Sequence, residues 1–291
     1  MRSINFKKLN NTAWYDGVYT KCQNSKTHVL DHSLHFASAV FEGIRIYNYK
    51  AFKLHEHIKR FRKSAEILGF KVPYKQNKLE KVCKTLIKKN KIANGYLRPL
   101  AWRSVGSMSP HSINIKIKTF IAIWDWPVYY SEDAIKNGIK LTISNWRRPK
   151  KESAPTQSKC SGLYQICTMA KNSSYKKGFD DALMLDTDDC IAETTSSNIF
   201  FVFKNKVVTP LPECFLNGIT RQEVIKICHK LNIKIEEKKI KFNQIKNATE
   251  CFVTGTAAEI TPVGRIGRLT FNVNNESITN KIFSYFKNNI I

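Results

Sequence analysis

The stretch APTQSKCSGLYQ, residues 154–165, contains the most informative side chain of the sequence, Lys159. Most lysines of the chain lie in polar, lysine-rich runs that are typical of a solvated surface. Lys159 instead lies among small polar residues, with Gly162 and Tyr164 soon after it. Burial lowers the pKa of a lysine amine, and its lone pair can then form a Schiff base with a carbonyl group. One lysine is weak evidence for catalysis, so the surrounding segments decide the interpretation.

The length and composition indicate a globular protein of two domains. The chain has 291 residues, of which 42% are hydrophobic and 11% aromatic, enough to bury a large core. Its longest apolar stretch, FIAIWDWPVYY, is too short to cross a bilayer and is interrupted by Asp125 and Pro127. The N-terminal MRSINFKKLNN has no apolar signal core. We therefore expect a cytoplasmic protein that has no membrane partner.

Cysteines and histidines give no sign of a metal centre. The eight cysteines are spread along the chain without a C-x-x-C pair, which argues against a zinc site and against a disulfide framework. His32 and His35 lie three apart, and His55 and His57 two apart, but neither pair has a third ligand at a recognisable spacing. We interpret these histidines as structural and expect no bound metal.

The formal net charge of +25 allows two interpretations. It could be the footprint of a nucleic-acid-binding protein, or it could be a surface built from lysine. The lysines are dispersed through nearly every segment, without a long basic block. This distribution favours the lysine-rich surface, which would still attract small anionic substrates and phosphorylated cofactors at low salt.

Hydrophobic periodicity predicts an α/β organisation in both halves of the chain. The first half reads as a hairpin turning at 16–17, helices over 55–68 and 77–89, and a strand over 113–124. The second half reads as a helix over 161–178, a strand over 181–186, a hairpin turning at 204–205, a helix over 221–232, and a strand running into a tight loop over 250–263. We predict a smaller N-terminal domain over residues 1–127, an interdomain linker over 128–137, and a larger C-terminal domain over 138–291 that carries the key lysine.

The turn LNGITRQE, residues 216–223, is the clearest candidate phosphate site. Gly218 permits close approach of the backbone, and Thr220 is predicted as an N-cap with Glu223 at the spacing of a capping box. The N-terminus of the helix then presents backbone N–H groups and a positive dipole end, which suit a phosphate. A plain capped helix is the alternative.

Three further positions each allow a functional and a structural interpretation. In TGTAAE, residues 254–259, small side chains leave backbone N–H groups accessible and Thr256 adds a hydroxyl, but the segment could be only a tight turn. Glu193 follows an apolar strand and could bind the protonated nitrogen of a pyridine cofactor, or it could be a surface carboxylate. Arg60 could anchor a phosphate, although its place beside Phe61 on an amphipathic helix favours a snorkelling surface arginine.

Seven segments of the chain, taken in order, resemble those of the class IV aminotransferases, and within them those of the branched-chain amino acid aminotransferases. The segments are LHFASAVFEGIRIY, EHIKRF, GYLRPLAW, the stretch quoted first, AETTSSNIF, LNGITR and TGTAAEITPV. The resemblance covers about residues 14–262. It implies a mixed α/β (α+β) fold of two domains, the D-amino-acid-aminotransferase-like fold type IV, which holds pyridoxal 5′-phosphate. The FEGIR and YLRPL segments favour the branched-chain subgroup over D-amino-acid aminotransferases and aminodeoxychorismate lyases.

The resemblance also implies a role for each cofactor residue. Lys159 would be the catalytic residue, which holds the cofactor as a Schiff base and then moves the substrate proton. Glu193 would pair with the ring nitrogen and keep it protonated, so that the ring withdraws electrons. Tyr164 would donate a hydrogen bond to the ring hydroxyl. The phosphate would be bound by Arg60, Gly218, Ile219, Thr220 and Thr256.

The implied substrate residues form a second set. The α-carboxylate would meet the Tyr96 hydroxyl and the backbone N–H groups of Thr256 and Ala257. The side-chain pocket would be walled by Phe36, Phe41, Trp126 and Tyr129. Because the same pocket must accept glutamate, it needs a cation at its rim, and Arg98 is the first candidate, with Arg45 as a helper. Met108 and Ser109 would lie in a loop that reaches the neighbouring subunit, so the resemblance implies a homodimer or a higher homo-oligomer.

Three departures from the family pattern concern single features. Phe36 stands where the family commonly has tyrosine, and the lost hydroxyl would weaken recognition of the glutamate side-chain carboxylate. Asn217 stands where proline is usual, which should change only the stiffness of that loop. The chain after Thr261 is short and lacks the usual glycine-rich stretch.

The expected function is a ping-pong transamination that serves branched-chain amino acid biosynthesis. Leucine, isoleucine or valine would give its amino group to the cofactor and leave as a 2-oxo acid, and 2-oxoglutarate would take the amino group and leave as glutamate. A D-amino-acid aminotransferase or an aminodeoxychorismate lyase would share every cofactor residue and remains an alternative. A basic nucleic-acid-binding protein is the alternative from another class, but without a recognisable binding module we expect no nucleic-acid partner.

Overall fold

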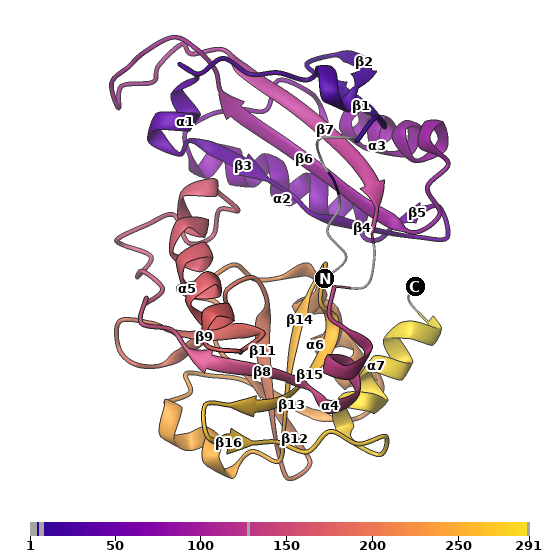
Figure 1. The fold of residues 1–291 in the computed structure, drawn as a ribbon, viewed down its shortest axis with the longest axis vertical. Coiled ribbons are helices and arrows are strands. Elements are labelled where there is room, and N and C mark those ends of the chain that lie inside the picture. The colour runs from indigo at the N-terminus through magenta and orange to yellow at the C-terminus, as the bar shows by residue number, and fades with distance from the viewer. Residues whose placement is uncertain (1–4, 6–8, 127–128, 290–291) are drawn as a thin grey trace. The chain divides into compact units, whose positions relative to one another are not determined.

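The computed structural model describes residue 5, residues 9–126 and residues 129–289 of the chain. The chain divides into two compact units, Met1–Val128 with Ser158–Leu163, and Tyr129–Gln157 with Tyr164–Ile291. Both units combine helices with one sheet each (Figure 1).

The observed division differs from the predicted one in the place of Lys159. We predicted that the C-terminal domain over 138–291 carries this lysine, but Ser158–Leu163 belongs to the first unit. The physical reason is hydrogen bonding of the backbone. The Phe41 N–H donates to the Lys159 carbonyl at 3.1 Å, and the Lys159 N–H donates to the Ser64 hydroxyl at 3.0 Å.

The predicted linker over 128–137 also differs from what the structure shows. From Tyr129 onward these residues belong to the second unit, and Tyr130 is buried in the core of that unit. Helix α4 occupies Glu132–Asn137. The predicted end of the first domain, at 127 and 128, lies outside the described residues.

The first unit is built on a seven-stranded sheet with the order β2-β1-β7-β6-β4-β5, in which β3 also pairs with β6. Every described pairing in it is antiparallel. The strands are β1 (Thr12–Tyr15), β2 (Val18–Lys21), β3 (Ala39–Phe41), β4 (Ile44–Tyr47), β5 (Lys50–Ala51), β6 (Gly95–Arg103) and β7 (Ile117–Asp125). The predicted hairpin is confirmed, because Asp16 and Gly17 take the positive φ angles of 44° and 104° that such a turn needs.

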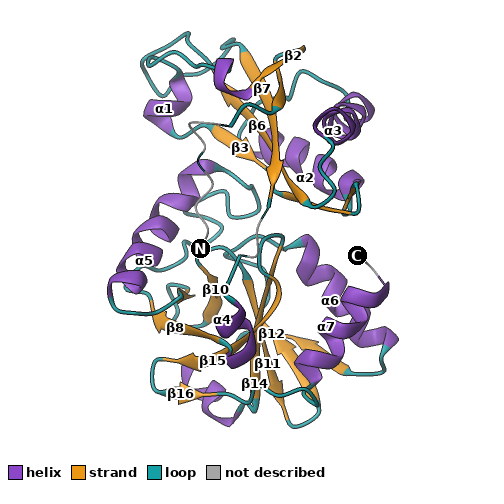
Figure 2. Ribbon diagram, turned by 45° about the vertical axis from the view of Figure 1, so that its right-hand side comes forward, coloured by secondary structure: helices purple, strands orange, loops and turns teal. Residues whose placement is uncertain are grey.

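Two amphipathic helices cover this sheet, and a short one precedes β3. Helix α2 (Leu54–Ile67) buries Ile58, Phe61 and Ala65, whose spacing of three and four residues forms one face. Helix α3 (Gln76–Asn90) packs against α2 and against β1, β5 and β7 (Figure 2). Both helices confirm the predicted ones to within one residue at each end. Helix α1 is short, at His32–Phe36, and the 3₁₀ turn Cys22–Asn24 follows β2.

The second unit is built on a nine-stranded mixed sheet with the order β10-β9-β8-β15-β14-β11-β12-β13, in which β16 also pairs with β15. The strands are β8 (Ile139–Ile143), β9 (Asp181–Leu185), β10 (Ile191–Thr194), β11 (Asn198–Phe203), β12 (Lys206–Thr209), β13 (Lys234–Glu237), β14 (Glu250–Gly255), β15 (Glu259–Ile266) and β16 (Leu269–Thr270). Strand β8 runs parallel to β9 and β15, and β12 runs parallel to β13. The sheet contributes most of a large apolar core that includes Ile199, Phe201 and Val253.

Three longer helices pack on the strands of this unit. They are α5 (Tyr164–Lys176), α6 (Ile219–Lys230) and α7 (Ile278–Asn289). Helices α6 and α7 lie side by side and both contact β14, whereas α5 contacts β9 (Figure 2). After Thr261 the described chain continues β15 to Ile266 and later forms the regular helix α7. Two 3₁₀ segments, Ser161–Leu163 and Phe242–Asn247, complete the described elements.

Two predicted elements begin later than expected. The strand predicted over 113–124 begins at Ile117, because Asn114 has a φ of 64° and interrupts the extended backbone. The helix predicted over 161–178 begins as a 3₁₀ turn and becomes α-helical only at Tyr164. Among the helices in the described part of the chain, none combines the length and apolar character that a membrane crossing requires.

Candidate active site

Lys159 lies in a short segment that two elements of the first unit hold from both sides. Its carbonyl accepts from Phe41 at the end of β3, and its N–H donates to Ser64 on α2. The residue is half-buried, and its amine lies 5.2 Å from the centre of the Phe41 ring. Burial, and after it the charge of Arg60, lower the pKa of the Lys159 amine. A lowered pKa increases the share of the neutral amine, which is the form that attacks a carbonyl carbon, and the fixed backbone holds that amine in place.

Arg60 is not a snorkelling surface arginine, because its guanidinium pairs with a buried carboxylate. Its Nε donates to Glu42 Oε1 at 2.6 Å and its Nη2 donates to Glu42 Oε2 at 2.9 Å. Glu42 is fully buried and also accepts from His57 Nδ1 at 2.8 Å. Burial is the largest single influence and would raise the pKa of Glu42, but the charges and hydrogen bonds of Arg60 and His57 together outweigh it and hold that pKa well below its usual range.

The structural interpretation of His57 agrees with its surroundings. Burial lowers its pKa, which favours the neutral ring, and the contact of Nδ1 with the Glu42 carboxylate requires the proton on Nδ1. The described residues contain no group of three or more His, Cys, Asp and Glu side chains that could hold a metal ion. No role was predicted for Glu42, although His57 and Arg60 at a spacing of three on one helix are a signal for a shared partner.

Four predicted substrate residues meet in the first unit. Tyr96 and Arg98 are two residues apart on β6, so their side chains lie on the same face of the sheet. Arg98 Nη2 donates to the Tyr96 hydroxyl at 3.4 Å. The Arg98 guanidinium lies 4.8 Å from the Phe41 ring centre, and Trp126 stacks on Tyr96 at 4.6 Å. Gly43 has to be a glycine, because a Cβ there would lie 1.8 Å from the Tyr96 hydroxyl.

The other predicted residues of this unit lie in different surroundings. Phe36 is 37% exposed at the end of α1 and packs on His32, with ring centres 4.6 Å apart. Met108 is exposed, and the Ser109 carbonyl accepts from His32 Nε2 at 3.0 Å. The Arg45 guanidinium lies 5.5 Å from the Tyr47 ring centre, although Arg45 pairs with Tyr96 in the β4–β6 register. Their predicted roles stay predictions.

In the second unit, Glu193 on β10 is a buried carboxylate with defined partners, not a surface group. Its Oε1 lies 3.5 Å from Arg148 Nε, and its Oε2 accepts from Asn198 Nδ2 at 3.2 Å. Burial is the largest single influence and would lower the pKa of Arg148, but the Glu193 carboxylate, together with smaller contributions from Cys167, Tyr164 and Cys214, outweighs it, and the pKa is raised. Arg148 and Asn198 were missed by the sequence analysis, since neither lies in a recognisable spacing with Glu193.

Asn198 also connects Glu193 to the predicted phosphate turn. Its Oδ1 accepts from the Gly218 N–H at 3.1 Å, so one side chain joins the carboxylate of β10 to the start of α6. The predicted capping box is wrong: Gly218 is the N-cap, the helix begins at Ile219, and Thr220 lies inside its first turn. The reason is that Asn198 fixes the backbone at Gly218, two residues before the predicted cap. Since no side-chain cap is found for α6 among the described residues, the start of this helix can offer backbone N–H groups to a ligand.

Asn217 has a structural role that the sequence did not reveal. Its Oδ1 accepts from Nη1 of the buried Arg221 at 3.0 Å. The same guanidinium donates through Nη2 to the Pro210 carbonyl and to Glu237. Asn217 therefore supplies an acceptor for a buried arginine at the place where the family commonly has proline.

Thr256 and Ala257 lie in the turn of the β14–β15 hairpin, as the sequence indicated. The turn closes against the loop before β11, and a Cβ on Gly255 would come within 3.0 Å of the Ser197 hydroxyl. Just before the turn, the hydroxyl of Thr254 is buried and has no hydrogen-bond partner among the described residues. A buried polar atom without a partner is a place where a ligand can supply one.

Tyr164 and Tyr129 both belong to the second unit. Tyr164 is the first residue of α5 and contributes to the raised pKa of Arg148, the arginine that pairs with Glu193. Tyr129 packs edge-on against Tyr130, with ring centres 4.7 Å apart, and the Lys171 amine lies 5.8 Å from its ring centre. The predicted place of Tyr129 in the substrate pocket stays a prediction.

We expect Gly218→Ala to lower the free energy of unfolding by about 1–3 kcal/mol. A Cβ on Gly218 would lie 2.2 Å from Asn198 Oδ1, so the amide would have to move and its bond to Glu193 would be lost. Urea unfolding of the cofactor-free protein measures the effect. Gly106→Ala is the control, because the three nearest atoms there all belong to the Ile115 side chain. Equal losses in both variants would contradict this assignment of Gly218.

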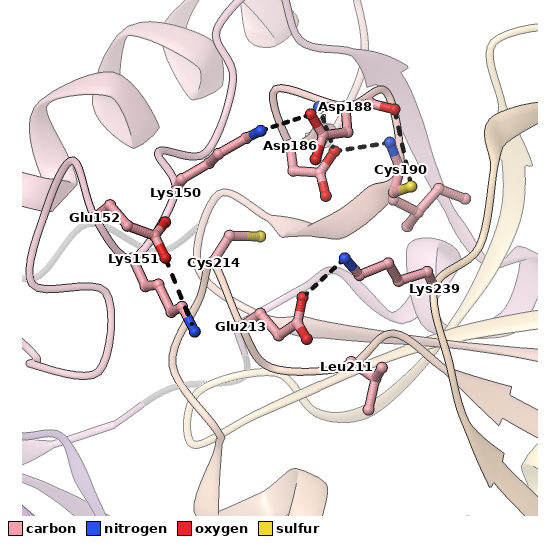
Figure 3. Close-up of a pocket in the computed structure, with 11 residues that line it drawn as sticks. Lys150, Lys151, Glu152, Asp186, Asp188, Cys190, Leu211, Glu213, Cys214 and Lys239 are labelled. Atoms are coloured by element: carbon pink, nitrogen blue, oxygen red, sulfur yellow. Dashed lines mark hydrogen bonds and ion pairs between the residues drawn. The ribbon is translucent and has the colours of Figure 1, made fainter.

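A polar hollow of about 370 Å³ in the second unit contains none of the predicted site residues (Figure 3). Its described lining includes Cys214, whose carbonyl accepts from Arg148 Nε at 3.3 Å. The lysines around it are paired with carboxylates: Lys150 with Asp188 at 2.8 Å, Lys239 with Glu213 at 3.2 Å, and Lys151 with Glu152 at 3.8 Å. Because these lysine charges are already compensated, the hollow is a weak competitor for a phosphorylated cofactor.

The residues present fit pyridoxal 5′-phosphate on structural grounds. The first unit holds a lysine amine of lowered pKa, and the second holds a buried carboxylate paired with arginine. The second unit also offers an uncapped helix start and the unpartnered hydroxyl of Thr254. An aldehyde, a ring nitrogen and a phosphate each require one of these features.

Comparison with known proteins also points to an aminotransferase. The family model described as amino-transferase class IV matches residues 39–266. A probable branched-chain-amino-acid aminotransferase of Rickettsia bellii is 41% identical over 263 residues, which cover 89% of this chain and 90% of that protein. A branched-chain-amino-acid aminotransferase of Pseudomonas aeruginosa is 32% identical over 257 residues, 87% of this chain and 84% of that protein.

Solved structures agree in fold. The branched-chain amino acid aminotransferase of Escherichia coli superposes with a TM-score of 0.92 at 29% identity, over 97% of this chain and 95% of that one. The branched-chain aminotransferase of Thermoproteus uzoniensis with norvaline gives a TM-score of 0.90 at 32% identity, over 95% and 93%. The predicted fold type IV is thereby confirmed. The chain belongs to the class IV aminotransferases, with the branched-chain amino acid aminotransferases among its relatives.

Proposed function

We propose that this protein is a pyridoxal-phosphate-dependent branched-chain amino acid aminotransferase. It transfers the amino group of leucine, isoleucine or valine to 2-oxoglutarate and yields a branched-chain 2-oxo acid and glutamate. The observation that carries the proposal is the family match over residues 39–266, which contains both Lys159 and Glu193 in the chemical settings just described. The related D-amino-acid and lyase activities are not favoured, because the named relatives act on branched-chain amino acids.

The cofactor, when bound, supplies the electron-withdrawing ring that makes the substrate α-proton acidic. We assign to Lys159 the covalent attachment and the movement of that proton. Glu193, held by Arg148 and Asn198, would keep a proton on the ring nitrogen. Tyr164 would donate to the ring hydroxyl.

The phosphate would be bound by Arg60 and by the start of α6. In α6 these groups are the backbone at Gly218 and Ile219 and the backbone and hydroxyl of Thr220, with Thr256 from the hairpin turn. Arg60 Nε and Nη2 both donate to Glu42, which fixes the plane of the guanidinium that would face the phosphate. Charge-assisted bonds of this kind give both orientation and affinity.

The substrate would be recognised by groups of two kinds. The Tyr96 hydroxyl and the N–H groups of Thr256 and Ala257 would bind its α-carboxylate. Apolar rings would accept its side chain, and Arg98 would face the second carboxylate of glutamate or 2-oxoglutarate. The apolar set consists of Phe36, Phe41, Trp126 and Tyr129.

The direct test is an amino-donor panel with 2-oxoglutarate as acceptor on the purified, cofactor-loaded protein. We expect L-leucine, L-isoleucine and L-valine to yield glutamate and D-alanine to yield almost none. A protein that stays colourless after addition of pyridoxal phosphate would refute the cofactor assignment. A preference for D-alanine would keep the cofactor and refute the substrate class.

Phe36→Tyr is expected to improve the use of 2-oxoglutarate. A hydroxyl at this position would add a hydrogen bond to the distal carboxylate, and a bond to a charged group is worth about 1.5–3 kcal/mol, or roughly tenfold or more in affinity. The KM for 2-oxoglutarate should fall while the KM for leucine changes little. Leu34→Met, a conservative change at an exposed residue of the same helix, is the control. An unchanged KM for 2-oxoglutarate would remove Phe36 from the pocket.

We also propose a cytoplasmic homo-oligomer, with at least two subunits and small molecules as its only ligands. The family resemblance supports the assembly, because it assigns to the loop with Met108 and Ser109 a contact with the neighbouring subunit. Light scattering of the purified protein measures the assembly, and a monomer that retains full activity would contradict it.

A further inference from the structure

One face of helix α2 carries three polar residues whose side chains all point to groups of the candidate site. His57, Arg60 and Ser64 are three and four residues apart, a spacing that places them in one stripe along the helix. The stripe is buried at both ends, since His57 is 1% exposed and Ser64 is fully buried. Buried polar side chains on an otherwise apolar helix face cost stability unless they are satisfied, so their retention needs an explanation.

The N-terminal end of the stripe is joined to Glu42. The paired contacts of Arg60 Nε and Nη2 with the two carboxylate oxygens fix the plane of the guanidinium. Glu42 is itself fixed, because Oε2 also accepts from His57 Nδ1 and from the Gly43 N–H at 3.2 Å. Because four donors fix the Glu42 carboxylate, and two of them belong to Arg60, the Arg60 guanidinium is held in one orientation.

The C-terminal end of the stripe is joined to the lysine segment. The Ser64 hydroxyl accepts from the Lys159 N–H at 3.0 Å, and the Ser64 carbonyl accepts from the Ser158 hydroxyl at 2.9 Å. Ser64 therefore fixes the backbone from which the lysine side chain projects. Arg60 and Ser64 are one helical turn apart, so the Arg60 guanidinium and the Lys159 backbone are both held by the same rigid helix.

We propose that Glu42 and Ser64 are positioning residues, which hold the Arg60 guanidinium and the Lys159 backbone on helix α2 at a fixed separation. The inference rests on the proposed function, because one cofactor would contact both residues. Its phosphate would meet Arg60 and its aldehyde carbon would meet Lys159, so the spacing of the two residues would have to match the cofactor. Glu42 acts through Arg60 and governs phosphate binding. Ser64 acts through Lys159 and governs only the covalent attachment.

The two roles predict different responses to two ligands. Pyridoxal phosphate can bind by its phosphate and react with Lys159, whereas pyridoxamine phosphate has no aldehyde and depends on the non-covalent contacts. Ser64→Ala should therefore weaken pyridoxal phosphate by about 3- to 10-fold, the effect of one neutral hydrogen bond, and leave pyridoxamine phosphate within about twofold. Glu42→Gln should weaken both ligands by about tenfold or more, because a charge-assisted pair is lost.

Binding is measured on the cofactor-free full-length protein by titration calorimetry, and attachment by borohydride trapping followed by peptide mapping. Trapping at Lys159 should be slower in Ser64→Ala, and Ser64→Thr, which keeps the hydroxyl, should restore it. Ser174→Ala and Glu250→Gln are matched controls in the second unit. Ser174 is a buried helical serine that donates to Ala170, and Glu250 is a buried carboxylate that accepts from the start of α7. Both controls should lower stability without changing the ratio of the two dissociation constants.

Three results decide the matter. If Ser64→Ala weakens both ligands equally, or neither, Ser64 only stabilises the fold and the proposal is wrong. If Glu42→Gln leaves pyridoxamine phosphate binding unchanged, the orientation of Arg60 does not depend on Glu42 and the proposal is wrong. If the glutamine variant does not fold, the same test is made with Glu42→Asp, which keeps the charge but shortens the side chain. If the wild-type protein binds neither ligand, the proposed function fails, and the positioning roles fail with it.

Discussion

Lys159→Ala is expected to lower kcat on the order of 10⁴-fold or more and to remove the borohydride-reducible attachment of the cofactor. The amine is the only group assigned both to hold the cofactor and to move the proton, so its loss removes two functions together. The structure gives it the required properties, a lowered pKa and a backbone held by Phe41 and Ser64. Steady-state turnover and mass spectrometry of the reduced protein measure the two losses.

The control for this variant is Lys151→Ala. Lys151 lies in the same connecting segment, but its side chain is 73% exposed and its nearest carboxylate, Glu152, is 3.8 Å away. Its removal should leave turnover and labelling unchanged. If a cofactor label persists in Lys159→Ala on another lysine with full turnover, the assignment of Lys159 is wrong.

Glu193→Gln is expected to lower kcat by about 10²- to 10³-fold, the usual effect of removing one preorganised electrostatic group from an active site. An amide cannot keep the ring nitrogen protonated, so the ring would withdraw electrons less strongly from the substrate. Because the amide has nearly the shape of the carboxylate, the KM for leucine should change little. The measured quantities are kcat and KM for leucine at saturating cofactor.

Two variants separate the ring contact from general destabilisation. Glu213→Gln removes an exposed carboxylate that pairs with Lys239 and should have no effect on kcat. Asn198→Ala removes the partner of Glu193 and should give an intermediate loss, because Arg148 still faces the carboxylate. A Glu193→Gln variant that retains wild-type turnover would exclude this residue as the partner of the ring nitrogen.

Local elements of the fold could be predicted from the sequence because each has a local cause. Helices α2 and α3 follow from the spacing of their apolar residues, and two hairpins follow from turn residues at Asp16–Gly17 and Lys204–Asn205. The unit to which Lys159 belongs could not be predicted in this way. It depends on hydrogen bonds to Phe41 and Ser64, which are distant in the sequence.

The same distinction applies to the candidate site. Lys159, Glu193 and the Gly218 turn carry recognisable segments, and the structure gives each of them a buried or half-buried setting. The residues that support them, Arg148, Asn198 and Glu42, were assigned no role because their partners lie on other elements. The start of α6 was placed two residues late for the same reason, since Asn198 and not Thr220 fixes its first turn.

Surface ion pairs compensate only part of the positive charge, because the chain has 48 Lys and Arg residues against 23 Asp and Glu residues. Several lysines form pairs with neighbouring carboxylates, among them Lys150 with Asp188 and Lys206 with Glu236, at 2.8 Å and 2.5 Å. Exposed pairs of this kind contribute little to stability. The excess of +25 agrees with a lysine-rich surface, and this excess would attract anionic substrates at low salt.

The most direct test of the account is the first half-reaction, without an amino acceptor. Cofactor-loaded protein is mixed with ¹⁵N-labelled L-leucine, and the products are identified by mass spectrometry. The account predicts that a stoichiometric amount of the branched-chain 2-oxo acid is released and that the label is found on the cofactor as pyridoxamine phosphate. If leucine remains unchanged while D-alanine is converted under the same conditions, the central claim is contradicted.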